Sequence, residues 1–328
     1  MENRTLGRTG RQTSVVGLGC WQLGGDWGRV DDADALAVLH AAVDAGVTFL
    51  DTADVYGDGR SEKLIGRFLR ERPDAGVTVA TKCGRRADPH VPQAFTAGNL
   101  RAWTDRSRAN LGVDRLDLVQ LHCPPTPVFG TDAVFDALDA LVTGGVLAAY
   151  GVSVETCDEA LAAIARPNVA SVQIILNAFR LKPLERVLPA ALAAGVGIIA
   201  RVPLASGLLS GRYDETTTFA ADDHRTYNRH GEAFDVGETF SGVPYAAGVD
   251  AARALGALAP EGVSTAAHAL RWIVDQPGVS VVIPGARNAA QARANAAAAD
   301  VPPLSPDVLA GIRSVYDERV RGFVHDRW

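Results

Sequence analysis

The sequence predicts an α/β protein folded as a single (β/α)8 TIM barrel, and three observations support this. Eight short, largely apolar segments alternate with stretches that have helical periodicity. The apolar segments lack polar alternation, as expected of parallel strands that are buried on both faces. The chain has 328 residues, a length that is usual for one α/β barrel. We therefore expect residues 1–328 to form one barrel domain.

The expected strands follow one another at regular intervals. A short β-hairpin over residues 3–13, with glycines at its turn, precedes them and is expected to plug the bottom of the barrel. In chain order, the expected strands are 14–19, 48–53, 77–82, 116–122, 147–153, 171–177, 196–202 and 279–284.

The segments between these strands are typical of amphipathic helices. In residues 32–45, Leu36, Leu39 and Val43 share one face. The tetrapeptide TCDE at 156–159 is a capping box, in which the first and last side chains satisfy free amides at a helix start.

An open, doubly wound sheet is the alternative architecture. It would require a phosphate-binding loop with the pattern G-x-G-x-x-G after the first strand. The segment GLGCWQLGG (17–25) is rich in glycine, but Gln22 occupies the position of the third glycine. The closed barrel is therefore favoured.

A long irregular segment, 210–248, separates the seventh and eighth expected strands. Loops of this length in a compact domain are usually functional or disordered. This one is too aromatic for a disordered linker, so we expect it to contribute to a substrate pocket. Its aromatic residues are Phe219, Tyr227, Phe234, Phe240 and Tyr245.

Composition excludes several classes of function. The formal net charge is −6 and no long basic run is present, which argues against nucleic-acid binding. No apolar run reaches the roughly 20 residues that span a bilayer, and the polar N-terminus does not resemble a signal peptide. The four cysteines include no C-x-x-C pair, so we expect reduced thiols, a cytoplasmic location and no metal site. The sequence leaves the oligomeric state open.

Ionisable side chains follow three consecutive strands. Asp51 ends the second strand and Tyr56 lies just after it, while Lys82 and His122 end the third and fourth strands. Active sites of such barrels lie at the carboxyl ends of the strands, so these four side chains are expected at one mouth. Each residue alone is more often structural, but the ordered set favours a site. Asp54, in the same loop, is expected to be a structural loop or surface carboxylate.

This set resembles the active site of the aldo-keto reductases, which are NAD(P)H-dependent carbonyl reductases on a (β/α)8 barrel, and the resemblance covers roughly residues 4–300. It implies that Tyr56 is the general acid and Lys82 its activator. It also implies that Asp51 is the partner of Lys82 and that His122 orients the carbonyl. A neighbouring ammonium should lower the pKa of the tyrosine toward the working range. The motifs are DTADVYG (51–57), TKCG (81–84), QLHCPP (120–125) and GVS (151–153).

The resemblance also implies an NADPH site. Ser153, Gln173 and Asn177 match positions at or beside the nicotinamide carboxamide. The glycine-rich loop 203–213 can bring backbone amides to a pyrophosphate, and Arg287 suits the 2′-phosphate of NADP. A second phosphate-binding segment, 283–299, follows the eighth strand. The residues expected to bind the cofactor in these two segments are Leu204, Ser206, Gly207, Leu209, Gly211, Gly285, Arg287, Gln291 and Asn295.

One position departs from the family pattern. Arg201 stands at the end of the seventh strand, where many members carry an aromatic residue that stacks on the nicotinamide. A guanidinium plane can also stack on a ring, and its charge should favour the reduced cofactor. Arg201 could instead reach the cofactor phosphates or an acidic substrate.

We expect Trp21 and Trp27 to form apolar walls for a small carbonyl substrate. Two rival functions remain open. One is a nucleotide-sensing module that resembles the potassium-channel β subunits. The other is a metal-dependent hydrolase with Asp51, Asp54 and His122 as ligands, although Lys82 would repel its metal.

Overall fold

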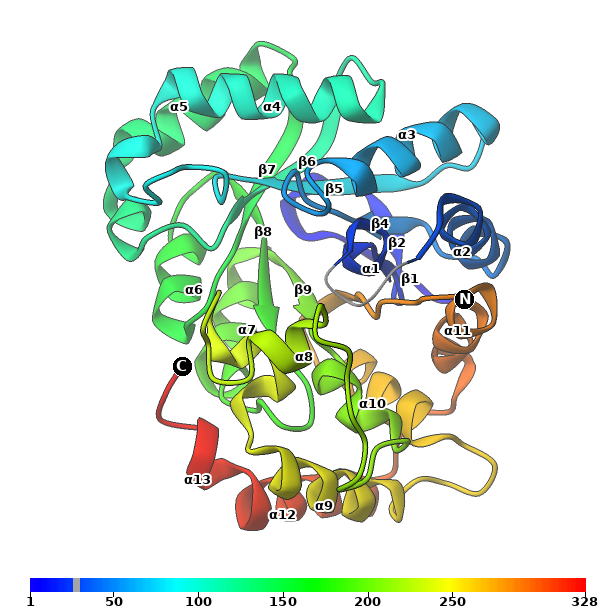
Figure 1. The fold of residues 1–328 in the computed structure, drawn as a ribbon. Coiled ribbons are helices and arrows are strands. Elements are labelled where there is room, and N and C mark those ends of the chain that lie inside the picture. Colours follow the sequence, from blue (N-terminus) through cyan, green and yellow to red (C-terminus); the bar gives the residue numbers. More distant parts are fainter. Residues whose placement is uncertain (26–29) are drawn as a thin grey trace.

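The computed structural model describes residues 1–25 and 30–328. The predicted pocket residue Trp27 lies outside the described residues. Eight parallel strands form one curled sheet, and consecutive strands along the chain are neighbours in it (Figure 1). These strands are β3 (Leu18–Gly19), β4 (Phe49–Asp51), β5 (Thr78–Cys83), β6 (Leu116–His122), β7 (Leu147–Ser153), β8 (Val169–Ile175), β9 (Gly197–Arg201) and β10 (Val279–Val282).

Parallel bridges close the barrel between the first and last strands. Val16 pairs with Val282 and Gly19 pairs with Gly285. The amide of Gly19 donates a 3.0 Å hydrogen bond to the carbonyl of Pro284. The predicted barrel is thus confirmed, and each of its eight strands lies within or beside an expected segment.

Helices surround the strands (Figure 1). The capping box at Thr156 and Glu159 is present at the start of α6, as predicted. The helices are α1 (Trp21–Gly24), α2 (Asp32–Asp44), α3 (Arg60–Glu71), α4 (Ala97–Leu111), α5 (Asp132–Thr143), α6 (Cys157–Ile164), α7 (Pro183–Ala194), α8 (His224–Tyr227), α9 (Tyr245–Gly256), α10 (Thr265–Val274), α11 (Ala289–Ala296), α12 (Pro306–Arg319) and α13 (Arg321–Val324).

The N-terminal hairpin closes the bottom of the barrel. Strands β1 (Asn3–Thr5) and β2 (Gln12–Ser14) pair antiparallel. Leu6 follows β1 and is fully buried in the barrel interior with Phe49 and Leu118. At Gly7, which has a positive φ of 45°, a Cβ atom would lie 2.0 Å from the backbone nitrogen of Gly197. The absence of a side chain therefore lets the hairpin approach the strands.

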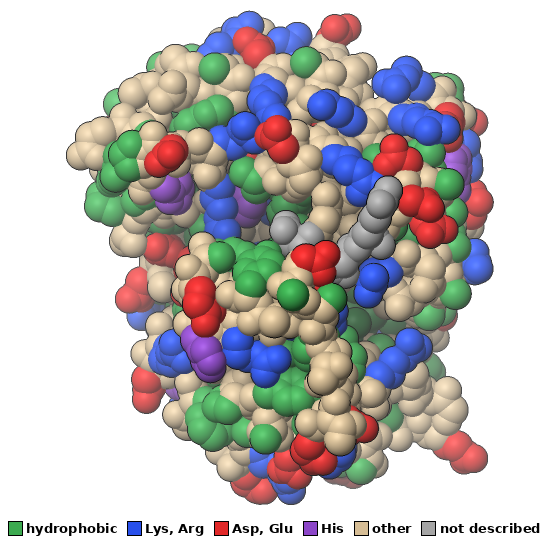
Figure 2. Space-filling model, viewed as in Figure 1, with side chains coloured by type: hydrophobic (Ala, Val, Ile, Leu, Met, Phe, Trp, Pro, Cys, Tyr) green, Lys and Arg blue, Asp and Glu red, His purple; other side chains and the backbone are tan. Residues whose placement is uncertain are grey.

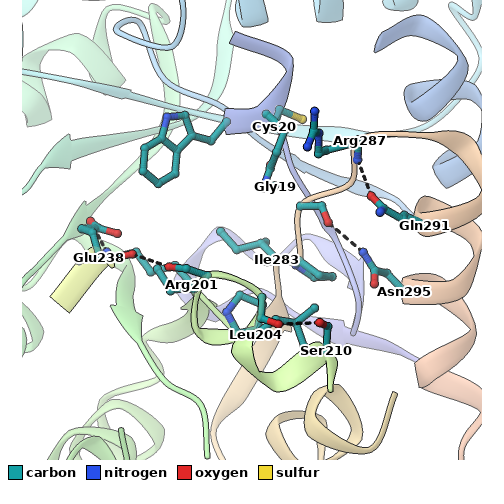
Figure 3. A pocket seen from close by; sticks show the side chains of 18 of the residues that line it. Gly19, Cys20, Arg201, Leu204, Ser210, Glu238, Ile283, Arg287, Gln291 and Asn295 are labelled. Carbon is teal, nitrogen blue, oxygen red and sulfur yellow. Dashed lines mark hydrogen bonds and ion pairs between the residues drawn. The ribbon is translucent and has the colours of Figure 1, made fainter. Parts of the chain in front are cut away.

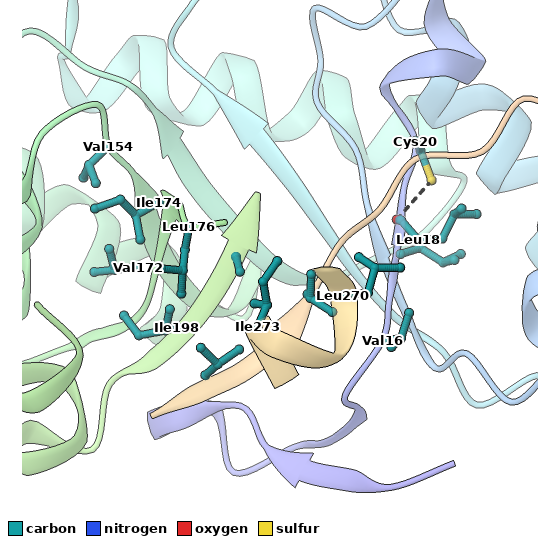
Figure 4. Close-up of a cluster of buried hydrophobic side chains, with 14 of the residues drawn as sticks. Val16, Leu18, Cys20, Val154, Val172, Ile174, Leu176, Ile198, Leu270 and Ile273 are labelled. Carbon is teal, nitrogen blue, oxygen red and sulfur yellow. Dashed lines mark hydrogen bonds between the residues drawn. The ribbon is translucent and has the colours of Figure 1, made fainter. Parts of the chain in front are cut away.

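A second, larger set of buried apolar side chains fills the space between the strands and the helices (Figure 4). Val172 of β8 and Ile198 of β9 belong to it, together with Leu270 and Ile273 of α10. The strands are therefore buried on both faces, which explains their continuous apolar sequence.

The segment 210–248, between β9 and α10, is folded. It contains α8, two 3-10 turns (Val236–Glu238 and Phe240–Gly242) and the start of α9. The expected irregular segment 210–248 is therefore partly helical, since α9 already begins at Tyr245.

The described residues include no helix that combines the length and the apolar character needed to cross a membrane. The face shown in Figure 2 carries acidic and basic side chains mixed together.

Candidate active site

An elongated cavity of about 950 Å³ opens at the carboxyl ends of the strands. Asp51, Tyr56 and His122 line one part of it, and Arg287 and Gln291 line another. The barrel thus brings side chains from the N-terminal and C-terminal parts of the chain into a single cavity.

The side chain of Lys82 lies at the centre of the predicted catalytic group. Its Nζ donates to Asp51 Oδ1 at 2.5 Å, to the carbonyl of Thr52 at 2.9 Å and to the hydroxyl of Tyr56 at 3.2 Å. An ammonium has three N–H donors, so these contacts use all of them. The lysine is 1% exposed, and its three contacts fix the phenol oxygen beside a buried positive charge.

Two amides hold the other oxygen of Asp51. Gln120 Nε2 donates to Asp51 Oδ2 at 3.1 Å, and Gln173 Nε2 donates to the same atom at 2.7 Å. Gln173 Nε2 also lies 3.1 Å from Gln120 Oε1. The carboxylate is therefore fully engaged, which keeps it directed at Lys82. Sequence reasoning did not identify Gln120, which lies on β6 two residues before His122.

Burial and charge shift the two proton-bearing groups of this cluster. Burial raises the pKa of Tyr56 above its usual value, and Lys82 opposes this shift only in part. The expected lowering toward neutrality is therefore not what the structure gives, because desolvation of the phenolate is the larger effect. Burial alone would lower the pKa of Lys82, but Asp51 and Tyr56 raise it above its usual value. Tyr56 keeps its proton and Lys82 stays charged.

His122 faces the same part of the cavity. Its ring centroid is 6.1 Å from that of Tyr56, in an edge-to-face arrangement. Burial lowers the pKa of His122 well below its usual value, and the charges of Arg85 and Lys82 lower it further. The imidazole is therefore neutral at physiological pH and can donate one hydrogen bond to a carbonyl oxygen.

The predicted nicotinamide-binding residues separate into two groups. Ser153 and Gln173 line the cavity, and the orientation of Gln173 follows from its contacts. Because its Nε2 donates to the acceptor-only carboxylate of Asp51, its carbonyl oxygen is the atom left for a ligand.

The expectation that Asn177 lies beside the nicotinamide is not supported by the structure. Its Nδ2 donates to the carbonyl of Val202 and to Ser241 Oγ, both at 2.8 Å, and it is not among the residues that line the cavity. The reason is that β8 ends at Ile175, two residues before the expected end, so Asn177 shapes the following turn.

Arg201 lines the cavity but is held by acidic side chains. Its Nη2 donates to Glu155 Oε2 at 2.9 Å and to the carbonyl of Val154 at 2.8 Å, and its Nη1 forms an ion pair with Glu238. Because two carboxylates neutralise it, the expected reach to cofactor phosphates is not what its contacts indicate.

The loop after β9 contributes Leu204, Ser206 and Gly207 to the cavity. Ser206 Oγ also accepts from the amide of Phe240 at 3.0 Å and donates to the carbonyl of Glu238 at 2.9 Å, so it anchors the long segment. Leu209 and Gly211 do not line the cavity. Leu209 is fully buried in the core instead, and a Cβ on Gly211 would meet Thr265 of α10.

The other end of the cavity lies at the N-terminus of α11. Gly285, Arg287, Gln291 and Asn295 all line it (Figure 3). Gln291 Oε1 accepts from the amide of Arg287 at 2.8 Å, and Asn295 Nδ2 donates to the carbonyl of Gly285 at 3.0 Å. Within the described residues, Arg287 has no acidic partner, which leaves its guanidinium available to a ligand anion.

Aromatic rings form the wall near Tyr56. The Trp21 ring is stacked 6.0 Å from the Tyr56 ring and lies 5.8 Å from that of Phe234. The predicted contribution of Trp21 and of the long segment to the pocket is thus consistent with the structure, in which both line the cavity.

Asp54 lies in the expected loop, but it is buried, with 0% of its surface exposed, so the alternative of a surface carboxylate is wrong. Neither of its side-chain oxygens has a hydrogen-bond partner among the described residues. Burial, followed by the charge of Glu62, raises its pKa to about 7. The metal-dependent rival is not supported here, because the oxygens of Asp51 are occupied by Lys82 and two amides.

Sequence reasoning also missed two charged residues, Arg85 and Glu155, which lie in loops after β5 and β7, respectively. The only signal was their position after strand ends, and this signal is weak because most loop charges are solvated.

Comparisons with known proteins agree with the fold. A model of the aldo/keto reductase family matches residues 15–317. The aldo-keto reductase YhdN of Bacillus subtilis is 31% identical over 301 residues, covering 90% of this chain and 87% of that protein. A probable voltage-gated potassium channel subunit beta of Arabidopsis thaliana is 28% identical, covering 97% of this chain and 98% of that protein.

A solved aldo/keto reductase of Klebsiella pneumoniae, in complex with NADP and acetate, has a TM-score of 0.71 at 23% identity. The alignment covers 96% of this chain and 95% of that one, and it shows the shared fold. The family match spans most of the chain and includes all eight strands of the barrel. This chain therefore belongs to the aldo/keto reductase family and is a nicotinamide-dependent oxidoreductase.

Proposed function

We propose that the protein reduces the carbonyl group of a small molecule to an alcohol, with NADPH as the cofactor and Tyr56 as the proton donor. The observation that carries this proposal is the contact of Lys82 Nζ with both Asp51 and the Tyr56 hydroxyl. It combines a protonated phenol with a fixed positive charge in a buried site.

The residues of the cavity fit the cofactor. The carbonyl oxygen of Gln173 and the hydroxyl of Ser153 line the catalytic end and can bind a carboxamide. The guanidinium of Arg287 at the other end is suited to a phosphate. Gly207 also lines the cavity, and a backbone without a side chain can approach a pyrophosphate there. When bound, NADPH would supply the hydride.

The protein's own groups handle the proton and the charge. His122 donates a hydrogen bond that orients the substrate carbonyl. Tyr56 transfers its hydroxyl proton to the carbonyl oxygen as negative charge develops there. Lys82 stabilises the resulting phenolate at 3.2 Å, and Asp51 keeps the lysine charged and directed at the phenol.

The choice of NADPH over NADH is tested by substitution of Arg287. We expect Arg287→Leu to raise KM for NADPH about tenfold or more, since it removes a charged hydrogen bond to the 2′-phosphate. KM for NADH should change little, because NADH lacks that phosphate.

The assay follows loss of reduced-cofactor absorbance with 4-nitrobenzaldehyde, and Arg313→Leu, on α12, serves as a control. Equal effects of Arg287→Leu on both cofactors would contradict the assignment. Tight NADPH binding without turnover of any aldehyde would instead favour a nucleotide-sensing role.

A further inference from the structure

Four side chains of alternating charge cross one end of the cavity, and we call them the charge chain: Arg85, Glu155, Arg201 and Glu238. Arg85 Nη2 lies 2.9 Å from Glu155 Oε1, and Arg201 Nη2 lies 2.9 Å from Glu155 Oε2. Arg201 Nη1 pairs with Glu238. The two positive and two negative charges sum to zero.

The charge chain lies at the catalytic end of the cavity. Arg85, Arg201 and Glu238 line the cavity together with His122 and Tyr56, and Glu155 holds both arginines from behind. In Figure 3, Arg201 and Glu238 lie at the opposite end from Arg287, Gln291 and Asn295. This is the end where the substrate carbonyl and the nicotinamide would meet, so the charge chain is placed to contact the substrate beside the cofactor.

Polar atoms of the charge chain remain available to a ligand. Arg201 is 6% exposed and its Nε is buried, so the atoms open to a ligand belong to Arg85 and Glu238. Among the described residues, Glu155 is the ion-pair partner of Arg85, whose side chain is 24% exposed. One oxygen of Glu238 pairs with Arg201, and with respect to the residues that the structure describes the second is left as an acceptor.

These atoms discriminate between classes of substrate. An alkyl group packed here would bury donors and an acceptor without partners, which is costly. A carboxylate would meet no net positive charge, because Glu155 and Glu238 already balance the two arginines. A hydroxyl group both donates and accepts, so it can bind Glu238 and an arginine together. The rings of Trp21 and Phe234 provide an apolar wall for C–H groups.

We propose that the charge chain is a subsite for substrate hydroxyl groups. The substrate is then a small, uncharged carbonyl compound with hydroxyl groups on the carbons next to the reacting one. This inference rests on the proposed reductase function of the same site.

The first test compares glyceraldehyde with propanal, which has the same carbon chain without hydroxyl groups. The ratio of their kcat/KM values with NADPH is measured for the wild type and for Arg85→Met. Aldehyde hydration is the same for every variant and cancels in this comparison. We expect the glyceraldehyde-to-propanal ratio to fall about tenfold in Arg85→Met, the loss of roughly one charged hydrogen bond.

The matched control is Arg253→Met, which removes an exposed arginine paired with Glu215 on the surface. Its ratio should equal that of the wild type. An unchanged ratio in Arg85→Met would contradict the subsite.

The second test changes the charge of the chain without changing its shape. Glu155→Gln leaves the two arginines with a net positive charge, so it should favour an anionic substrate. We expect the kcat/KM ratio of succinic semialdehyde to butanal to rise several-fold in Glu155→Gln, a gain that loss of structure would not produce. An unchanged or lower ratio would overturn the proposal.

The outcomes separate this inference from the proposed function. Turnover of propanal and glyceraldehyde with the same ratio in all variants would remove the subsite and leave the reductase function intact. Absence of NADPH-dependent turnover with either aldehyde, in protein that is folded, would contradict both.

Discussion

Three contacts of Lys82 determine the chemistry at the scale of single residues. The residue types that reduction requires could be predicted from the sequence, because an acid, its activating cation and a carboxylate follow consecutive strands. The direction in which the pKa of Tyr56 shifts could not be predicted, because it depends on burial, which in the folded site outweighs the charge of Lys82. Burial of Asp54 was likewise invisible in the sequence.

The raised pKa of Tyr56 predicts the pH dependence of the reaction. Reduction requires the protonated phenol, and neutral His122 does not titrate near pH 7 because its pKa is lowered. We expect kcat/KM for reduction to be constant from about pH 6 to 8 and to fall only in the alkaline range. Alcohol oxidation requires the phenolate, so its rate should rise with pH. If kcat/KM for reduction instead fell about tenfold for each unit of rising pH between pH 6 and 8, this prediction would be contradicted.

Asp54 predicts a pH-dependent stability. Its pKa is about 7 in the folded protein and about 4 in an unfolded chain. Between these values the unfolded state releases the proton and the folded state retains it, so stability falls as pH rises.

We expect Asp54→Asn, which carries no such charge, to gain stability relative to the wild type from about pH 4 to 7, on the order of 4 kcal/mol in total. Above about pH 8 the difference should stay constant. Urea unfolding across this pH range measures it, and a difference independent of pH would show that the carboxyl is not buried in its protonated form.

At the scale of elements, side chains at or just after strand ends hold the long segment after β9 through hydrogen bonds and ion pairs. The alternation of strands and helices could be predicted, because apolar runs and capping signals are local. The roles of Asn177 and Arg201 could not, because their partners, Ser241 and Glu238, lie in the long segment after β9. Contacts across more than thirty residues leave no periodic signal in the sequence.

The hairpin predicts a separation between stability and catalysis. Leu6 is fully buried at the bottom of the barrel, far along the strands from the catalytic mouth. We expect Leu6→Ala to lower the free energy of unfolding by about 2 to 5 kcal/mol. kcat for 4-nitrobenzaldehyde should stay within about twofold of wild type at a temperature where the variant is folded. A large loss of kcat with unchanged stability would contradict this division.

At the scale of the whole molecule, the barrel places stability at one end and chemistry at the other. The cavity runs from the Lys82 cluster to the N-terminus of α11, and it brings residue 51 beside residue 173 and places residue 287 along the same cavity. The fold class follows from strand count and spacing alone. The charge chain does not follow from them, since its members come from the end of β9 and from the segments after β5, β7 and β9, which are distant in sequence.

The most direct test of the proposed chemistry is the kcat of Tyr56→Phe with NADPH and 4-nitrobenzaldehyde, measured beside the Kd for NADPH from quenching of protein fluorescence. Phenylalanine keeps the ring against Trp21 and removes only the hydroxyl that Lys82 contacts at 3.2 Å. We predict a loss of kcat of at least about a hundredfold with a Kd for NADPH within about threefold of wild type. A variant that binds NADPH normally and retains wild-type kcat would show that Tyr56 is not the proton donor.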